Sequence, residues 1–290
     1  MQCTAPSKQR LQNIGKRGLN PWKGKRMPKF TFIDVEAVWD ELLHEAYREI
    51  DPRGAAKQKR KDQHRHRVPC KRVIAAAAFD IEIEDSGKLS IGGLKSWTEH
   101  DHGDEREVVS NLFDHLLARP DAHVVTYSGL AAEVPLLTLA AMEHGLVMPG
   151  QLRTGVSGFR RQGSWRPHID LALELKGQGR DWAHLSELGL RLGLPGTLFM
   201  GKPDIEQPRS GAEWLALRER VSMDCILTAI IALSFWRANG RIRLDQNAML
   251  YIIADWCLRN PSAAKSSLEP LAILRSQMFA RLGAALDEAA

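Results

Sequence analysis

Apolar residues are densest between residues 71 and 240, where their spacing changes several times. A continuous apolar run from Val73 ends in Asp80-Ile81-Glu82, with basic residues before it and Asp85-Ser86-Gly87 after it. Such a run, bounded by polar and turn-forming residues, predicts a buried strand over Val73–Glu84. Because side chains alternate across a strand, Asp80 and Glu82 point to the same face.

The segments that follow predict alternating strands and helices. Glycine, proline and capping residues mark several helix ends, including Ser210-Gly211-Ala212-Glu213, which forms a capping box. The expected elements are a weak strand over 89–97, a helix over 105–117, a strand over 123–127, a helix over 133–144, a helix over 182–192 and a long helix from 210 to about 236. This order indicates an α/β or α+β domain.

Both ends of the chain have a different pattern. Residues 1–29 show little apolar periodicity, and the spacing of Val35, Val38, Leu42 and Ala46 predicts an amphipathic helix over 34–50. Residues 241–290 are expected to be mostly helical, with a break at Asn260-Pro261. We therefore predict a partly disordered N-terminal extension (1–70), a core domain (71–240) and a helical C-terminal extension (241–290).

Charge sets the N-terminal region apart. Residues 1–72 hold 18 lysines and arginines against 8 acidic residues, a net of +10, whereas the remainder carries a net of −5. Clusters that include Lys25, Arg26, Lys59 and Arg60 are typical of segments that bind phosphate backbones without reading sequence. A disordered, solubilising leader has the same composition, so both interpretations stay open.

The composition narrows the class of protein. No apolar run approaches the ~20 residues needed to span a bilayer, and the first residues do not have the order of a signal peptide. We expect a cytoplasmic protein without a membrane partner, and the sequence leaves its oligomeric state open. The four cysteines form no C-x-x-C pair, which argues against a zinc site.

Acidic residues are the candidate chemistry. Two carboxylates side by side, as at Asp80 and Glu82, repel each other unless a cation lies between them, and hard oxygen ligands favour Mg2+ or Mn2+. Asp224 has apolar neighbours in a helix, where a charge needs a partner. The alternatives are a solvated acidic strand face, a favourable helix N-terminal charge for Glu133, and a structural ion pair for Asp224.

The order of these residues resembles the DEDD superfamily of 3′–5′ exonucleases, and most closely predicted exonucleases related to the proofreading domain of family B DNA polymerases. Its D-x-E motif is matched by Asp80-Ile81-Glu82, and its T-Y-N-G motif by Thr126-Tyr127-Ser128-Gly129. Its helical aspartate is matched by Asp224. Two further segments fit, His168-Ile169-Asp170-Leu171 and Leu192-Gly193-Leu194-Pro195-Gly196.

The resemblance implies a ribonuclease H-like fold, with a mixed sheet flanked by helices, and hydrolysis of phosphodiester bonds assisted by two Mg2+ or Mn2+ ions. By that resemblance Asp80 would bridge both ions, Glu82 and Asp224 would hold the ion that activates water, and Glu133 would assist the other. The implied substrate is nucleic acid with a single-stranded or frayed 3′ end, with DNA favoured over RNA.

Two positions depart from the family pattern. Glu133 stands where the family has aspartate, and its extra methylene displaces the carboxylate oxygens by about 1 Å. Arg220 replaces a tyrosine that orients the attacking water four residues before the helical aspartate, and it would instead contact a phosphate. The candidate substitute bases are His168, Tyr127 or a group that acts through a neighbouring residue, and the sequence does not rank them. Asp170 is either a structural acceptor or a displaced ligand.

These departures define the alternatives to a 3′–5′ exonuclease. The first is a catalytically impaired nucleic-acid-binding module on the same fold. The second is an assembly protein whose basic arm binds an acidic partner. A nuclease requires the carboxylates of Asp80, Glu82, Glu133 and Asp224 to converge within a few ångströms of one position, as coordination of a hard cation demands.

Overall fold

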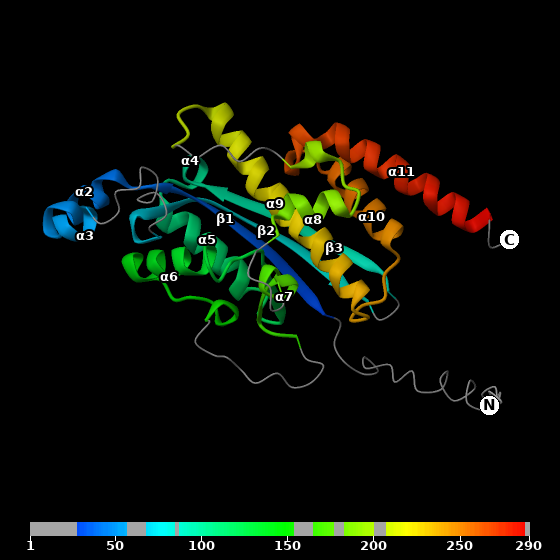
Figure 1. Ribbon diagram of the computed structural model, residues 1–290, viewed down its shortest axis with the longest axis horizontal. Helices are drawn as coiled ribbons and strands as arrows, with labels where there is room; N and C mark the ends of the chain where they lie inside the picture. Colours follow the sequence, from blue (N-terminus) through cyan, green and yellow to red (C-terminus); the bar gives the residue numbers. More distant parts are fainter. Residues whose placement is uncertain are drawn as a thin grey trace, which may run out of the picture.

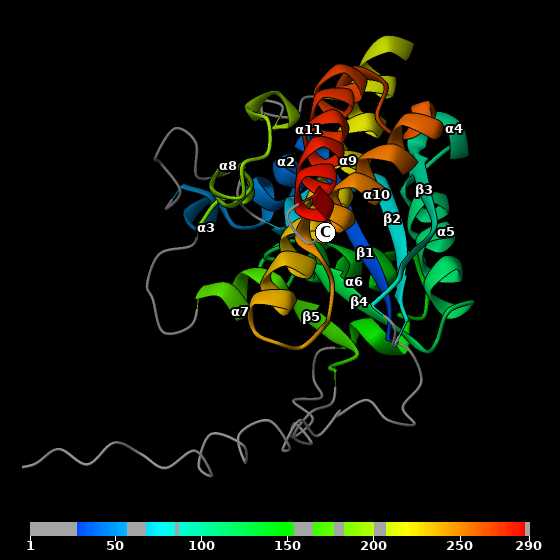
Figure 2. The same ribbon diagram turned by 90° about the vertical axis from the view of Figure 1, so that its right-hand side faces the viewer.

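The computed structural model describes residues 28–56, 68–84, 87–153, 165–176, 183–199 and 207–287. It is an α/β structure in which helices cover both faces of one mixed sheet of five strands (Figures 1 and 2). The predicted ribonuclease H-like fold class is confirmed by this arrangement.

The strands lie in the order β3-β2-β1-β4-β5. Their bounds are Lys29–Trp39 (β1), Lys71–Ile83 (β2), Leu89–Thr98 (β3), Ala122–Thr126 (β4) and His168–Asp170 (β5). The pairs β1–β2 and β2–β3 are antiparallel, whereas β4 and β5 run parallel to β1. The parallel connections need crossovers, which the helices between the strands provide.

Strand β1 is the centre of the sheet, and this corrects two predictions. The sequence analysis expected a helix over 34–50 and a core that starts near Lys71. Instead the chain is extended from Lys29 to Trp39 and pairs with both β2 and β4, and a helix begins only at Glu41. Asp40 caps that helix by accepting a hydrogen bond from the backbone N–H of Leu43. The core of the fold therefore begins at Lys29.

One face of the sheet is covered by α5 (Glu105–Leu117) and α6 (Glu133–His144), which have the bounds that the sequence predicts. Ile33 and Val35 of β1 pack here with the apolar side of both helices. Gly145 ends α6 in the left-handed conformation, where the missing Cβ removes a steric cost. This layer holds no residue of the C-terminal helices in its apolar cluster.

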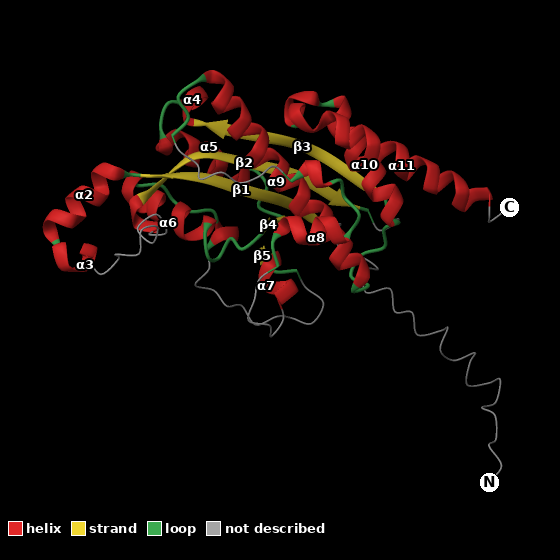
Figure 3. Cartoon of the chain, turned by 45° about the horizontal axis from the view of Figure 1, so that its top comes forward, coloured by secondary structure: helices red, strands yellow, loops and turns green. Residues whose placement is uncertain are grey.

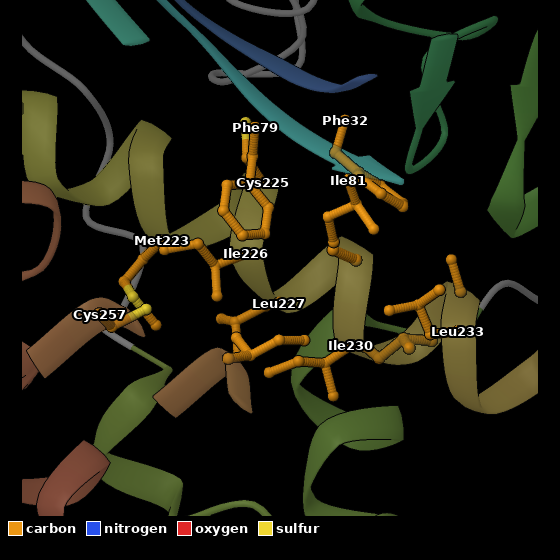
Figure 4. Close-up of a cluster of buried hydrophobic side chains, with 14 of the residues drawn as sticks. Phe32, Phe79, Ile81, Met223, Cys225, Ile226, Leu227, Ile230, Leu233 and Cys257 are labelled. Atoms are coloured by element: carbon orange, nitrogen blue, oxygen red, sulfur yellow. The ribbon is translucent and has the colours of Figure 1, made fainter. Parts of the chain in front are cut away.

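The opposite face is covered by α9 (Gly211–Ala238), which is almost entirely buried from Val221 to Trp236. Phe32 of β1 and Phe79 and Ile81 of β2 point toward it (Figure 4), and Phe30 of β1 belongs to the same apolar cluster. The four alanines at 75–78 keep β2 thin, so that helices approach it from both sides. Together these contacts make the larger of the two hydrophobic clusters.

The remaining helices surround these layers. Their bounds are Glu41–Ile50 (α2), Pro52–Ala56 (α3), Glu99–His102 (α4), Leu171–Lys176 (α7), Leu185–Arg191 (α8), Gln246–Arg259 (α10) and Leu268–Asp287 (α11), with short 3-10 turns at Val68–Cys70, Gly150–Leu152, Gly196–Leu198, Pro261–Ala263 and Lys265–Ser267. The predicted break at Asn260-Pro261 is confirmed, since α10 ends at Arg259. Helices α2 and α3 extend from one end of the sheet (Figure 3), and none of the residues of α2 is buried.

Helix α9 is the one described helix that is long and apolar enough to cross a membrane. However, 78% of its most apolar window is buried inside the protein. This degree of burial is what the central helix of a folded core requires.

Candidate functional site

Two neighbouring strands carry the same acidic spacing on opposite faces of the sheet. Asp34 and Glu36 lie on β1, and Asp80 and Glu82 lie on β2. In the β1–β2 pairing Asp34 is opposite Ala77, whereas Asp80 is opposite Thr31. Residues opposite each other share a face, and side chains alternate between the faces along a strand. Thr31 and Asp34 are three residues apart on β1, so Asp34 lies on the face opposite to that of Thr31 and Asp80.

Asp34 and Glu36 face α9 and meet Asp224 there. One carboxylate oxygen from each of these three residues lies within 4.8 Å of the other two. The three side chains come from two elements that are far apart in sequence and pack directly on each other. We call Asp34, Glu36 and Asp224 the carboxylate group. Three converging hard oxygen donors fit a divalent cation such as Mg2+ or Mn2+.

The pair at Asp80 and Glu82 faces α5 instead, and the predicted convergence with Asp224 is wrong. Phe79 and Ile81 point toward α9 (Figure 4), so Asp80 between them points away. Asp80 lies 3.1 Å from His115 Nε2 and 3.1 Å from Arg119 Nε, and the Thr31 hydroxyl donates to it at 2.7 Å.

Glu82 continues the same network of charges. Its carboxylate lies 3.7 Å from Lys29 Nζ and 3.7 Å from Arg119 Nη2. Arg119, just after α5, and Lys29 on β1 therefore compensate the charge of the pair. Their environment is that of a structural ion-pair network, in which no metal is needed to compensate the charge.

Arg220 contacts the carboxylate group directly. Its Nε lies 2.9 Å from Oε1 of Glu36, and the two side chains are only 14% and 12% exposed. Glu219, its neighbour, points elsewhere and accepts a hydrogen bond from the backbone N–H of Ser266. The arginine that replaces the expected tyrosine is thus paired with a carboxylate in this structure.

Glu133 approaches the carboxylate group from the loop after β4. Val125 of β4 is opposite Phe32 of β1, so the chain leaves β4 beside Asp34. The carboxylate of Glu133 is buried at the first turn of α6. Its oxygens are not among those within 4.8 Å of one another, so the structure brings it near the group but not into it.

The loop before Glu133 has a strained backbone that Asp170 holds in place. Ser128 has φ +64°, in the left-handed region that few residues other than glycine and asparagine adopt. The Asp170 carboxylate accepts hydrogen bonds from the backbone N–H groups of Ser128 and Leu130, at 3.1 and 3.0 Å. Asp170 therefore acts as a structural acceptor.

Gly129 in the same loop has no room for a side chain. A Cβ at this position would lie 2.1 Å from Oγ1 of Thr126, well inside van der Waals contact. The glycine lets the chain turn tightly at the end of β4. This turn is what carries α6, with Glu133 at its start, toward β1.

The pKa of the Cys225 thiol depends on the carboxylates that surround it. It is fully buried next to Asp224, and burial raises its pKa well above the ordinary value. The negative charges of Asp34, Asp224 and Glu133 raise this pKa further. The Cys225 thiol therefore stays protonated beside these carboxylates.

The two substitute bases lie beside the group rather than in it. His168 Nε2 is 2.9 Å from the Thr126 hydroxyl, and burial lowers the pKa of the ring. The Tyr127 hydroxyl donates to the carbonyl of Ala183, and burial raises its pKa to about 12. Neither contact directs these side chains at the carboxylate group.

A cavity of about 440 Å³ opens beside β5, next to the same loop. Its lining includes Leu130, Asp170, Phe235 and two arginines, Arg166 and Arg241. Arg241 pairs with Glu174 and stacks on Trp165, with its guanidinium carbon 3.6 Å from the ring centroid. Arg166 is exposed and forms no ion pair with the residues that the structure describes.

Other predicted or possible site residues lie elsewhere. Lys25, Arg26, Lys59 and Arg60, expected to bind nucleic acid, fall outside the described residues. A second acidic cluster includes Glu105 and His144 on the α5–α6 face. There Glu105 accepts from the backbone N–H of Val73 at 2.6 Å and from His144 at 3.0 Å, which is a structural role.

The sequence analysis missed Asp34 and Glu36, although a signal was present. Phe32-Ile33-Asp34-Val35-Glu36 is an apolar segment that ends in the same D-x-E spacing as the one chosen. Its aromatic and β-branched residues favour a strand. The helical spacing from Val35 to Ala46 concealed it, because that spacing runs across the end of β1 and into α2.

Comparison with known families identifies the family of this chain. A family described as predicted 3′–5′ exonuclease related to the exonuclease domain of PolB matches residues 64–268. The match begins after β1, so the place of Asp34 and Glu36 rests on the structure alone. No curated protein is similar enough to the chain to count as a match. With more than half of its length matched, the chain belongs to the family of predicted 3′–5′ exonucleases related to the exonuclease domain of PolB.

Proposed function

We propose that the protein is a 3′–5′ exonuclease that depends on divalent metal ions and acts on single-stranded or frayed 3′ ends, with DNA preferred over RNA. The observation that carries the proposal is the convergence of Asp34, Glu36 and Asp224 within 4.8 Å. It occurs on the fold of a family of predicted exonucleases. Family membership supports the reaction class, and the carboxylate group supports the dependence on metal.

The donor set suits Mg2+ or Mn2+. Its oxygens come from carboxylates, which are hard ligands, and no cysteine thiolate competes, since burial keeps Cys225 protonated. When bound, such ions supply an activated water and stabilise the charge on the leaving 3′ oxygen. Asp34, Glu36 and Asp224 are the residues that would hold them, in place of the Asp80 and Glu82 expected from the sequence.

The other residues of the site position these ligands. Cys225 packs at the backbone of Asp34, which fixes the height of α9 on β1. Asp170 and Gly129 shape the loop that delivers Glu133, whose carboxylate would assist through water or by orienting the 3′ end. The rigid scaffold matters, because a misplacement of about 1 Å costs on the order of 100-fold in rate.

The cavity next to β5 would receive the substrate strand near the loop of Glu133. Arg166 at its rim offers a guanidinium to a backbone phosphate, and Phe235 and Leu130 offer apolar surface to a base. The basic clusters of the N-terminal region would add affinity that does not depend on sequence and falls with salt.

A direct test uses single-stranded DNA labelled at the 5′ or the 3′ end, incubated with Mn2+. A 3′–5′ exonuclease shortens the 5′-labelled strand stepwise and releases the 3′ label as a mononucleotide. Asp224→Asn removes a ligand charge without changing volume, and we expect its rate to fall by about 1,000-fold. An RNA strand of the same sequence measures the preference for DNA.

Asp245→Asn is the matched control for this test. Asp245 caps α10 by accepting a hydrogen bond from the backbone N–H of Ala248, and asparagine caps equally well. Asp245→Asn should keep full activity, and a chelator should abolish the activity of the wild type and of Asp245→Asn. Activity that survives in Asp224→Asn, or in the presence of the chelator, would overturn the proposal.

The second candidate function is a nucleic-acid-binding module with impaired catalysis. It is favoured by the ion pair between Arg220 and Glu36, which occupies one carboxylate of the group. This alternative predicts salt-sensitive binding of oligonucleotides with no release of nucleotides under any divalent metal. The labelled-strand assay therefore separates the two functions.

A further inference from the structure

Arg220 is the one basic side chain that forms an ion pair with the carboxylate group among the described residues. Its Nε lies 2.9 Å from Glu36 Oε1 inside the packed layer between α9 and β1. The neighbouring arginine on α9, Arg218, pairs instead with Asp101, and both of those side chains are one-third exposed. Two arginines of one helix turn thus serve different carboxylates in different surroundings.

The charge of Arg220 is permanent. A guanidinium keeps its proton under all conditions in which proteins fold, so this positive charge cannot be removed by deprotonation when a metal ion approaches. A cation that uses Glu36 must either displace the guanidinium or bind while both share the carboxylate. In each case the burial of the pair strengthens the repulsion between the two positive charges.

A neutral side chain would behave differently at this position. The related enzymes are expected to carry a tyrosine here, which adds no charge and leaves the glutamate available to a cation. In this chain the arginine neutralises one of the three negative charges that Asp34, Glu36 and Asp224 bring together. Arg220 also holds the Glu36 side chain in a defined place when no metal is bound.

We propose that Arg220 is a positioning residue that occupies Glu36 in competition with divalent cations and thereby sets the affinity of the carboxylate group for metal. The proposal rests on the proposed function, in that the group binds such ions. Binding of a metal ion is then coupled to release or sharing of Glu36 by Arg220. The protein would need higher metal concentrations than a relative with a neutral residue at this position.

The test is a titration of the full chain with Mn2+, in which electron paramagnetic resonance measures the free ion. Arg220→Gln removes the positive charge next to Glu36, and we expect Mn2+ to bind about tenfold more tightly or better. Arg220→Lys keeps the charge and should stay within about threefold of the wild type. Arg220→Met gives a second neutral variant, with the same expectation as Arg220→Gln, in case one of them does not fold.

Arg218→Gln is the matched control. It removes the same charge from a position two residues earlier on α9, where the arginine pairs with Asp101 outside the carboxylate group. It should leave the affinity for Mn2+ within about twofold, since an exposed charge is screened by solvent and salt. A tenfold gain in Arg218→Gln as well would mean that net charge alone is responsible, and would overturn the role of Arg220.

Two further outcomes are distinguishable. Equal Mn2+ affinity in the wild type and in the neutral variants of Arg220, combined with loss of binding in Asp34→Asn, would overturn this inference and leave the proposed function standing. Absence of Mn2+ binding in the wild type and in both neutral variants would remove the proposed function itself. A tighter neutral variant whose binding still depends on Asp34 supports both.

Discussion

The two acidic pairs of this protein have the same spacing, on strands that pair with each other, yet they have opposite surroundings. Asp80 and Glu82 are matched by His115, Arg119 and Lys29, so that their charge is compensated within the fold. Asp34 and Glu36 gather a third carboxylate from α9 and are matched by Arg220. The first pair thus lies among cationic side chains, while the second converges with a further carboxylate.

The comparison teaches that the D-x-E spacing does not identify a metal site by itself. What matters is which helix covers the face to which the carboxylates point. His115 on α5 and Arg119 just after it lie on one face of the sheet, and α9 presents Asp224 to the other. The three carboxylate oxygens that converge beside α9 are hard ligands, and this makes the α9 face the candidate for binding cations.

Exchange of the two aspartates for asparagine in separate variants gives the largest expected effect. Asp34→Asn should lower the rate of nucleotide release by about 1,000-fold, because it removes a ligand from the carboxylate group. Asp80→Asn should change the rate by less than about threefold where the protein is folded. Single-turnover rates with labelled DNA and Mn2+ measure both.

The reverse result would break the comparison. If Asp80→Asn abolished the reaction while Asp34→Asn left it intact, the catalytic pair would be the one on β2. The identity of the helix that covers each face of the sheet would then not determine which carboxylates are catalytic.

Stability should show the opposite ranking. Asp80→Asn leaves His115 and Arg119 without their buried partner, and we expect the free energy of unfolding to fall by about 3 kcal/mol. Asp34→Asn relieves repulsion among clustered carboxylates and should stay within about 1 kcal/mol of the wild type. Urea denaturation followed by circular dichroism gives both values, and similar losses in the two variants would contradict the distinction.

The smallest expected effect is that of a substitution in the loop that brings Glu133 toward the carboxylate group. Ser128 has φ +64°, and asparagine tolerates this conformation better than serine does. Ser128→Asn should therefore raise the free energy of unfolding by about 0.5 kcal/mol, and leave Mn2+ binding unchanged. Ser128→Ala, which has no side-chain hydrogen bond to offer, is the control and should not be stabilised. A destabilised Ser128→Asn would show that the serine makes a contact of its own.

The fold class could be predicted because most elements carry local signals. Helices α5 and α6 begin and end where their capping and glycine residues indicate, and the Ala-rich strand β2 is continuous and apolar. The family match was anticipated from motifs between residues 73 and 240, which lie inside the matched range. These features depend on neighbours in the sequence, which a single chain displays.

Only part of the candidate site could be predicted from the sequence. Asp224 was found because a charge among apolar helical residues is conspicuous, and the structure places it in the carboxylate group. The choice between the two D-x-E segments required the register of β1 on β2, and the alanines from 75 to 78 give no indication of which face is which. The partners of Asp80, His115 on α5 and Arg119 just after it, lie more than 30 residues away, and no local pattern indicates them.

Helix α9 is held in place by packing contacts that lie far from the carboxylate group. Asp224 lies 12 residues before Trp236, or about 18 Å along the helix axis, and Trp236 is fixed by stacking on Phe30 with ring centroids 4.6 Å apart. A tilt of about 3° at that contact would move the Asp224 end by about 1 Å, which is as much as a change of ligand. The accuracy of the carboxylate group is therefore set in part by aromatic packing at the distant end of the sheet.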